Sequence, residues 1–403
     1  MARRERSQGR LPYLSIALLT TLSAAACGGA GTTVGPTVQV PGPGAAAPGS
    51  SSTTGTPTAP AATPRAASTS TPGPTLGATA TPAPQTTSPG AAVAGGYAPL
   101  GAPGPPLDVP ASSLSASLTC TSNVGSSSER TILLVPGTTL TPPVNYDWNY
   151  ERAFTANGVP WCAVTLPDNA MGDIPTAGEY VVNAIRTVAA RSGRSVNILG
   201  FSQGGMVPRW ALRFWPDTRA LVDQYVALDP SNHGTLDAYP VCAVGCAPAF
   251  WQQQTGSHFT TALNSGVETF AGISYTVIYS DVDEVVVPNL PVASSSSLTT
   301  GNGTIANISV QSICPTDVSD HLAMGSYDPV GYALAIDSFT RNAVAKPGDV
   351  PLTVCATLLQ PGVDPTAFPG NYAMYLAYIG NTIATTPFVS AEPTLPPYVY
   401  AAQ

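Results

Sequence analysis

The chain has 403 residues and is acidic, with a formal net charge of −8 and only 9% charged residues. The first 106 residues carry a net charge of +4, so the remaining part, about 300 residues long, carries −12. Such an acidic segment excludes a nucleic-acid-binding protein, because phosphate neutralisation requires clustered Lys and Arg. Its length suffices for one large domain with its own hydrophobic core.

Residues 1–27 predict an export signal. Four arginines between residues 3 and 10 precede an uncharged apolar run from Leu11 to Ala26, an order typical of signal peptides. The run is too short to span a membrane comfortably. Two processing routes fit the sequence: cleavage before Cys27 with lipidation and membrane anchoring there, or ordinary cleavage after the small residues.

Residues 28–106 consist mostly of Pro, Thr, Ala, Ser and Gly, with Arg65 as the only charged residue. Such a segment has too little large apolar surface to offset the entropy lost on ordering. We therefore predict a disordered or partly polyproline-II stalk, followed by one folded domain over residues 107–403.

Six cysteines remain beside Cys27, and an even number in an exported chain predicts disulfides. Their proximity in sequence pairs Cys242 with Cys246. The pairing of the other four is left open by spacing alone: Cys120, Cys162, Cys314 and Cys355. A zinc site is disfavoured, because the sequence has neither CxxC pairs nor clustered histidines. We expect no metal and no organic cofactor.

Predicted strands and helices alternate along the folded part. Continuous apolar runs predict buried strands at residues 131–135, 161–165, 196–199, 222–228 and 273–279. Helical spacing or capping residues predict helices at residues 150–156, 175–192 and 329–340. This rhythm predicts an α/β fold with a mostly parallel sheet flanked by helices, with functional residues at the carboxyl ends of the strands.

The sequence Gly200-Phe201-Ser202-Gln203-Gly204 follows one of these strands and precedes a helix. In this context the pattern is typical of a nucleophilic serine on a sharp turn, where the flanking glycines allow close packing. A serine hydroxyl is a weak nucleophile and requires an adjacent base. Ser202 is therefore the candidate nucleophile.

Three histidines are available as the base: His233, His258 and His321. Only His321 leaves room for an acidic residue between itself and Ser202, in the order nucleophile, acid, histidine. Two candidates for that acid, Asp281 and Asp283, follow the strand at residues 273–279. We interpret His233 and His258 as loop or surface residues.

Several motifs in one order resemble the Candida antarctica lipase B-like family of α/β-hydrolases. The resemblance extends from about Cys120 to Cys355 and rests on five segments: 133–138 (LLVPGT), 201–205 (FSQGG), 251–253 (WQQ), 279–284 (YSDVDE) and 320–321 (DH). It implies an α/β-hydrolase fold and a serine lipase or esterase that hydrolyses carboxylic, acylglycerol-type esters through an acyl-enzyme. We expect an ester substrate, no nucleic acid and a monomer.

The resemblance also implies roles for individual residues. It identifies Ser202, Asp283 and His321 as the catalytic triad and selects Asp283 over Asp281. It implies an oxyanion hole formed by Thr138 and Gln203. The substrate pocket that it implies is lined by Phe201, Leu140, Gln253, Val285 and Val286. It further implies the disulfides Cys120–Cys162 and Cys314–Cys355.

The chain departs from the family at several positions. Phe201 stands where the family has Trp, which predicts a deeper alcohol pocket that admits bulkier secondary alcohols. Pro208 lies inside the helix after the nucleophile, and Cys242 and Cys246 have no family equivalent. Two alternatives to a lipase stay open: an esterase or acyltransferase acting on short-chain or polymeric esters, and a catalytically silent cell-envelope binding protein.

Overall fold

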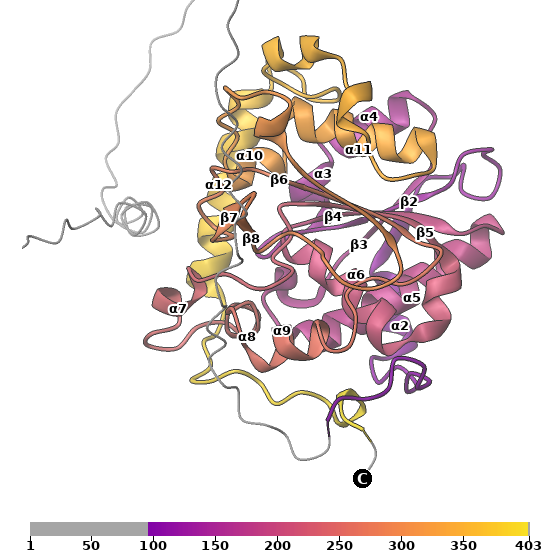
Figure 1. Cartoon of the computed structure of the whole chain (residues 1–403), viewed down its shortest axis with the longest axis vertical. Helices are drawn as coiled ribbons and strands as arrows, with labels where there is room; N and C mark the ends of the chain where they lie inside the picture. The colour runs from indigo at the N-terminus through magenta and orange to yellow at the C-terminus, as the bar shows by residue number, and fades with distance from the viewer. Residues whose placement is uncertain (1–95, 402–403) are drawn as a thin grey trace, which may run out of the picture. The chain divides into compact units, whose positions relative to one another are not determined.

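A seven-stranded sheet forms the centre of the computed structural model, which describes residues 96–401 (Figure 1). The strand order is β1-β3-β2-β4-β5-β6-β9. All neighbouring pairs are parallel except β1, which runs antiparallel to β3 at one edge. The strands are β1 (Leu118–Cys120), β2 (Ile132–Val135), β3 (Trp161–Val164), β4 (Val196–Phe201), β5 (Val222–Leu228), β6 (Ser274–Tyr279) and β9 (Thr304–Ser309). A separate two-stranded sheet pairs β7 (Asn289–Leu290) with β8 (Ala293–Ser294).

The central strands are continuous apolar runs because both faces of the sheet are covered. Along β2, Leu133 and Val135 pack into one core, whereas Ile132 and Leu134 pack into the other. The first core contains α5 (Ile174–Ser192) and α6 (Gln203–Phe214), and the second contains α4 (Tyr150–Ala156) and α11 (Pro329–Arg341). The remaining α-helices are α2 (Ala111–Ala116), α3 (Pro142–Tyr146), α7 (Ala238–Val241), α8 (Pro248–Gln252), α9 (His258–Leu263), α10 (His321–Met324) and α12 (Phe368–Thr385). The predicted α/β-hydrolase architecture is confirmed.

Helix boundaries follow the capping residues in the sequence. The Asp173 carboxylate accepts the Thr176 N–H at the start of α5, and Gly193 ends that helix in a left-handed conformation with φ of 65°. The Asp328 carboxylate accepts the N–H groups of Val330 and Gly331 at the start of α11. Helix α6 continues through Pro208 without interruption.

Three disulfides join the described cysteines. Cys120–Cys162 links β1 to β3 at paired positions of the ladder, with a Cα–Cα distance of 4.0 Å. Cys242–Cys246 closes a short ring directly after α7, and Cys314–Cys355 ties the segment after β9 to a later loop. These are the three expected pairings, so the predicted disulfides are confirmed.

The packed domain includes residues that composition alone assigned to the stalk. The buried Ala98 donates its N–H to the Val399 carbonyl at 2.9 Å, and the Trp215 indole donates to the Pro105 carbonyl at 2.9 Å. The boundary expected at residue 107 therefore lies inside a packed segment. The predicted signal, Cys27 and the stalk up to residue 95 lie outside the described residues. Within residues 96–401, no helix has the length and hydropathy needed to cross a bilayer.

Candidate active site

Ser202 occupies a strained turn between β4 and α6. Its backbone has φ of 54° and ψ of −123°, a region that non-glycine residues rarely adopt. Its N–H donates to the Leu228 carbonyl at 2.9 Å, and its side chain is nearly buried, with 5% of the residue exposed. Strain of this kind persists only where the surrounding structure enforces it, and it is concentrated at functional sites.

The glycines around Ser202 are required by close backbone contacts. A Cβ atom at Gly200 would collide with the Gly204 carbonyl, and one at Gly204 would collide with the Val135 carbonyl. The strand, the turn and the helix can therefore approach one another only with glycine at both positions. This packing explains the Gly-x-Ser-x-Gly pattern in physical terms.

His321 and Asp283 form a buried hydrogen-bonded pair. The imidazole Nδ1 lies 2.9 Å from the Asp283 Oδ2, and both side chains are almost fully buried. Asp281, the alternative acid, lies in the same turn and donates its N–H to the Gln311 side chain at 2.8 Å. The structure therefore places Asp283 against His321.

The Asp283 carboxylate is fixed by several donors. Its Oδ1 accepts the N–H groups of Val285 and Val286, each at 2.8 Å, and its Oδ2 accepts the Asn289 amide at 3.2 Å. These donors compensate for the burial of a carboxylate and set its orientation toward His321. A carboxylate in this position selects one tautomer of the imidazole.

The electrostatic environment of His321 favours its protonated form. Burial lowers the pKa of His321, but the bonded Asp283 carboxylate, together with Glu284 and Asp320, raises that pKa above its ordinary value. The imidazole ring also lies 4.8 Å, between centroids, from the ring of Phe201, the residue before Ser202. The base and the serine turn are thus in the same cluster.

Thr138 contacts Gln203, the residue that follows Ser202. The Thr138 hydroxyl oxygen accepts the Gln253 side-chain amide at 3.0 Å and the Gln203 side-chain amide at 3.3 Å. Gln253 is itself held by the Ser231 hydroxyl at 2.8 Å. The Thr138 hydroxyl can in turn donate to the Gln253 Oε1, which lies 3.5 Å away. Gln203 opens α6, where a backbone N–H has no acceptor within the helix.

The five expected pocket residues differ in their surroundings. Phe201 and Leu140 are buried in the core, with 2% and 1% exposure. The Phe201 ring is held so closely that a Cβ atom at Gly137 would lie 2.8 Å from it, and one at Gly325 would collide with it. The Phe201 ring also packs against the imidazole of His321, and its role as the floor of the alcohol pocket stays a prediction. Gln253 and Val286 are also buried, whereas Val285 is exposed.

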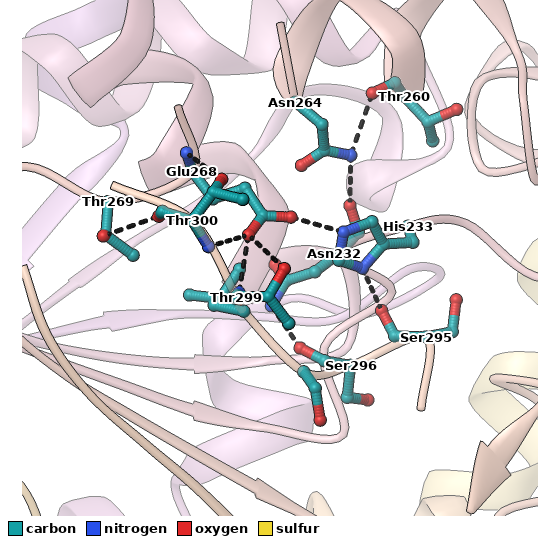
Figure 2. Close-up of polar contacts among 12 residues, drawn as sticks. Asn232, His233, Thr260, Asn264, Glu268, Thr269, Ser295, Ser296, Thr299 and Thr300 are labelled. Carbon is teal, nitrogen blue, oxygen red and sulfur yellow. Dashed lines mark hydrogen bonds and ion pairs between the residues drawn. The ribbon is translucent and has the colours of Figure 1, made fainter. Parts of the chain in front are cut away.

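The other two histidines lie in different environments. His258 is exposed at the start of α9. His233 lies in the loop after β5, where its Nε2 is 2.5 Å from the buried Glu268 carboxylate and its Nδ1 is 3.0 Å from the Ser295 carbonyl (Figure 2). The second Glu268 oxygen accepts the N–H groups of Thr299 and Thr300. This cluster joins three loops.

Sequence reasoning missed one carboxyl group in the site. Asp229 directly follows β5, is fully buried, and lies with Asp283 and His321 in a group whose polar atoms are within 4.8 Å of one another. Three such residues can hold a metal ion. However, four N–H donors already surround Asp283, an arrangement suited to a hydrogen-bonded carboxylate rather than to a cation ligand. The sequence contained a signal for this residue, because Asp229 stands at the carboxyl end of a predicted strand, on the same edge of the sheet as Ser202.

The chain is similar in sequence and in fold to known lipases. The chain is 35% identical to lipase B of Pseudozyma antarctica over 294 residues, which cover 72% of this chain and 84% of that protein. The crystal structure of Aspergillus fumigatus lipase B matches with a TM-score of 0.67 and 28% identity, covering 73% of each chain. No family model matches the sequence. The chain belongs to the lipase B family of α/β-hydrolases and is a carboxylic ester hydrolase.

Proposed function

We propose that the protein hydrolyses acylglycerol-type esters with Ser202, His321 and Asp283 as its catalytic triad. The observation that carries this proposal is the buried His321–Asp283 hydrogen bond of 2.9 Å beside a serine held on a strained strand-to-helix turn. Ser202 attacks the ester carbonyl while His321 takes its proton, and Asp283 orients and stabilises the resulting imidazolium. Water then releases the acid from the acyl-enzyme.

The developing oxyanion is stabilised by Thr138 and Gln203 in this mechanism. The backbone N–H groups of both residues and the Thr138 hydroxyl supply the donors. Removal of one such donor typically costs about 3 to 4 kcal/mol in the barrier. Gln253 contributes by holding the Thr138 hydroxyl oxygen at 3.0 Å, which orients its proton.

Ser202→Ala provides the direct test. We expect this variant to lose several orders of magnitude in kcat on p-nitrophenyl esters and on emulsified triglyceride, with an unchanged Tm. A fluorophosphonate probe should label the wild type and not the variant. Turnover near the wild-type value in Ser202→Ala would refute the triad, and an unlabelled, inactive wild type would favour a binding protein with a silent hydrolase fold. A profile confined to short or polymeric esters would favour the esterase alternative.

We further propose that the protein is exported, because three disulfides form and persist most readily in an oxidising compartment. Mass spectrometry of the mature N-terminus distinguishes the two processing routes. A diacylated or triacylated Cys27 indicates anchoring, whereas an unmodified terminus indicates release. Full-length protein retained in the reducing cytoplasm would refute export.

A further inference from the structure

Two neighbouring strands each lead to an aspartate beside His321. β5 ends at Leu228 and is followed at once by Asp229, while β6, paired in parallel with β5, leads to Asp283. The Asp229 N–H continues the ladder by donating to the Ile278 carbonyl at 2.8 Å, and its φ is 41°. A non-glycine residue in this left-handed region, next to a candidate active site, indicates a position that the structure enforces.

The Asp229 carboxyl group shares its partners with the triad. Its Oδ1 accepts the Ser280 N–H at 2.8 Å and the Asn289 amide at 3.2 Å. The same Asn289 nitrogen donates to the Asp283 Oδ2 that pairs with His321. The other Asp229 oxygen, Oδ2, is buried and has no hydrogen-bond donor. One polar atom from each of Asp229, Asp283 and His321 lies within 4.8 Å of the other two.

Two buried carboxyl groups that lie this close and share one amide donor repel each other unless one of them carries a proton. Burial raises the pKa of Asp229 well above its ordinary value, and the charges of Asp283 and Asp328 raise it further. Asp283 instead accepts hydrogen bonds from two backbone N–H groups and lies against the His321 imidazole. Asp229, whose Oδ2 has no donor, is therefore the member of the pair that holds a proton.

On the basis of the proposed triad, we propose that Asp229 is a positioning residue that donates its carboxyl proton to Asp283 and thereby limits the negative charge presented to His321. The acidic groups that face His321 explain why its negative surroundings must be limited. Asp283, Glu284 and Asp320 all favour the imidazolium. A histidine that stays protonated at neutral pH cannot accept the proton of Ser202. Asp229 moderates this effect without removing the Asp283 bond.

Two substitutions separate this role from packing. Asp229→Asn keeps an oxygen for Ser280 and Asn289 and offers an N–H to Asp283, so it mimics the protonated acid. We expect its kcat/KM and the acidic limb of its pH profile to match the wild type within about twofold and about 0.3 pH unit. Asp229→Ala removes the donor. We expect the acidic limb of its pH profile to lie about one pH unit higher than in the wild type. Below that limb, kcat/KM should be about tenfold lower.

Opposite shifts would overturn the proposal. If Asp229 were ionised, its replacement by Asn would remove a negative charge and move the acidic limb to lower pH. An acidic limb that stays fixed in Asp229→Ala, even with a reduced kcat, would indicate a packing role only. Asp281→Asn is the matched control, because it removes a carboxylate from the same turn without a bond to His321. Its limb should stay at the wild-type pH.

Two further measurements keep the test decisive. NMR titration of the His321 imidazole should show the same ordering of pKa values without reference to activity. If Asp229→Ala fails to fold, Asp229→Asn still decides between a neutral and an ionised Asp229. Ser202→Ala, assayed in parallel, separates failure of this inference from failure of the proposed triad, because only the latter leaves wild-type and Ser202→Ala activities equal.

Discussion

At the scale of single residues, the two aspartates after β6 have unequal tasks. Only Asp283 bonds to the His321 Nδ1, whereas Asp281 bonds through its backbone to Gln311. We expect Asp283→Asn to lower kcat by about 10⁴-fold, since the amide stabilises the wrong imidazole tautomer. Asp281→Asn should stay within a few-fold of the wild type. Steady-state kinetics on a soluble ester check this, and greater sensitivity at Asp281 would mean that another acid orients the base.

Phe201 gives a second prediction at this scale. Its ring is enclosed by Gly137, Gly325 and the imidazole of His321, so the larger Trp of the family has no free space there. We expect Phe201→Trp to displace His321, lowering kcat at least about tenfold on every ester. Overpacking should cost about 1 to 3 kcal/mol of stability. Thermal melts and kinetics on primary and secondary alcohol esters check this. An unchanged Tm with selective loss of activity on secondary esters would instead support Phe201 as the floor of the alcohol pocket.

The triad residues could be predicted from the sequence, whereas the role of Asp229 and the orientation of Phe201 could not. Ser202, Asp283 and His321 stand in recognisable motifs, so their approach to one another could be predicted. Asp229 could not be ranked, because its importance depends on burial and on a shared contact with Asn289, 60 residues away. The orientation of Phe201 likewise depends on glycines from two other segments.

At the scale of elements, the ring closed by Cys242 and Cys246 follows α7 and carries exposed apolar side chains, with Val244 92% exposed. Its disulfide is buried, and Cys246 also pairs through its backbone with Val389. Because so short a ring gains little from loop closure, we expect Cys242→Ser/Cys246→Ser to change the Tm by only about 1 to 2 °C. By the resemblance to the lipase family, this ring stands where the family has a short mobile helix over the pocket. We therefore expect the ratio of activity on emulsified to soluble substrate to rise, since a looser cover opens more readily. An equal ratio in mutant and wild type would show that the disulfide is only a local staple.

The hydrogen bonds of Glu268 to His233 and Thr299 join the loop after β5 to the segments around residues 268 and 299 (Figure 2). Burial favours a raised pKa for Glu268, but the His233 hydrogen bond and the Arg209 charge outweigh it and hold that pKa well below its usual range. A depressed folded-state pKa stabilises the protein above the unfolded pKa, about 4.3, and this contribution is lost as the pH falls through the folded value.

Glu268→Gln should therefore be less stable than the wild type at pH 7, and the difference should shrink as the pH falls below about 4. Urea unfolding at several pH values measures this. Glu129→Gln, at an exposed position, serves as the control and should change stability little. A difference that stays constant with pH would mean that the contribution of Glu268 does not depend on its charge.

Elements were predictable to different degrees. The strands β2 to β6 appear in the sequence as apolar runs, because a parallel sheet buries both of their faces. β9 was not predicted, since its edge position leaves Thr304 and Asn307 exposed. The helix Phe368–Thr385 was also not predicted, because few of its residues are buried and its apolar spacing is weak.

At the scale of the whole molecule, the domain is larger than composition suggested, because residues 96–106 pack on it despite their Pro- and Gly-rich sequence. Composition measures how much apolar surface a segment carries, but it contains no information on the surface against which that segment packs. Here the Arg213 and Arg219 side chains donate to the Ala98 and Leu100 carbonyls and hold this segment in place.

Tyr97 pairs with Tyr400, so both ends of the described chain leave the domain together (Figure 1). The adjacent Tyr398 packs on Trp210, Phe214 and Trp215 at the last turns of α6, whereas Ser202 precedes its first turn. A helix of 12 residues is about 18 Å long. A resin, electrode or fusion partner joined next to residue 96 or residue 401 would therefore hold the enzyme by the side remote from Ser202.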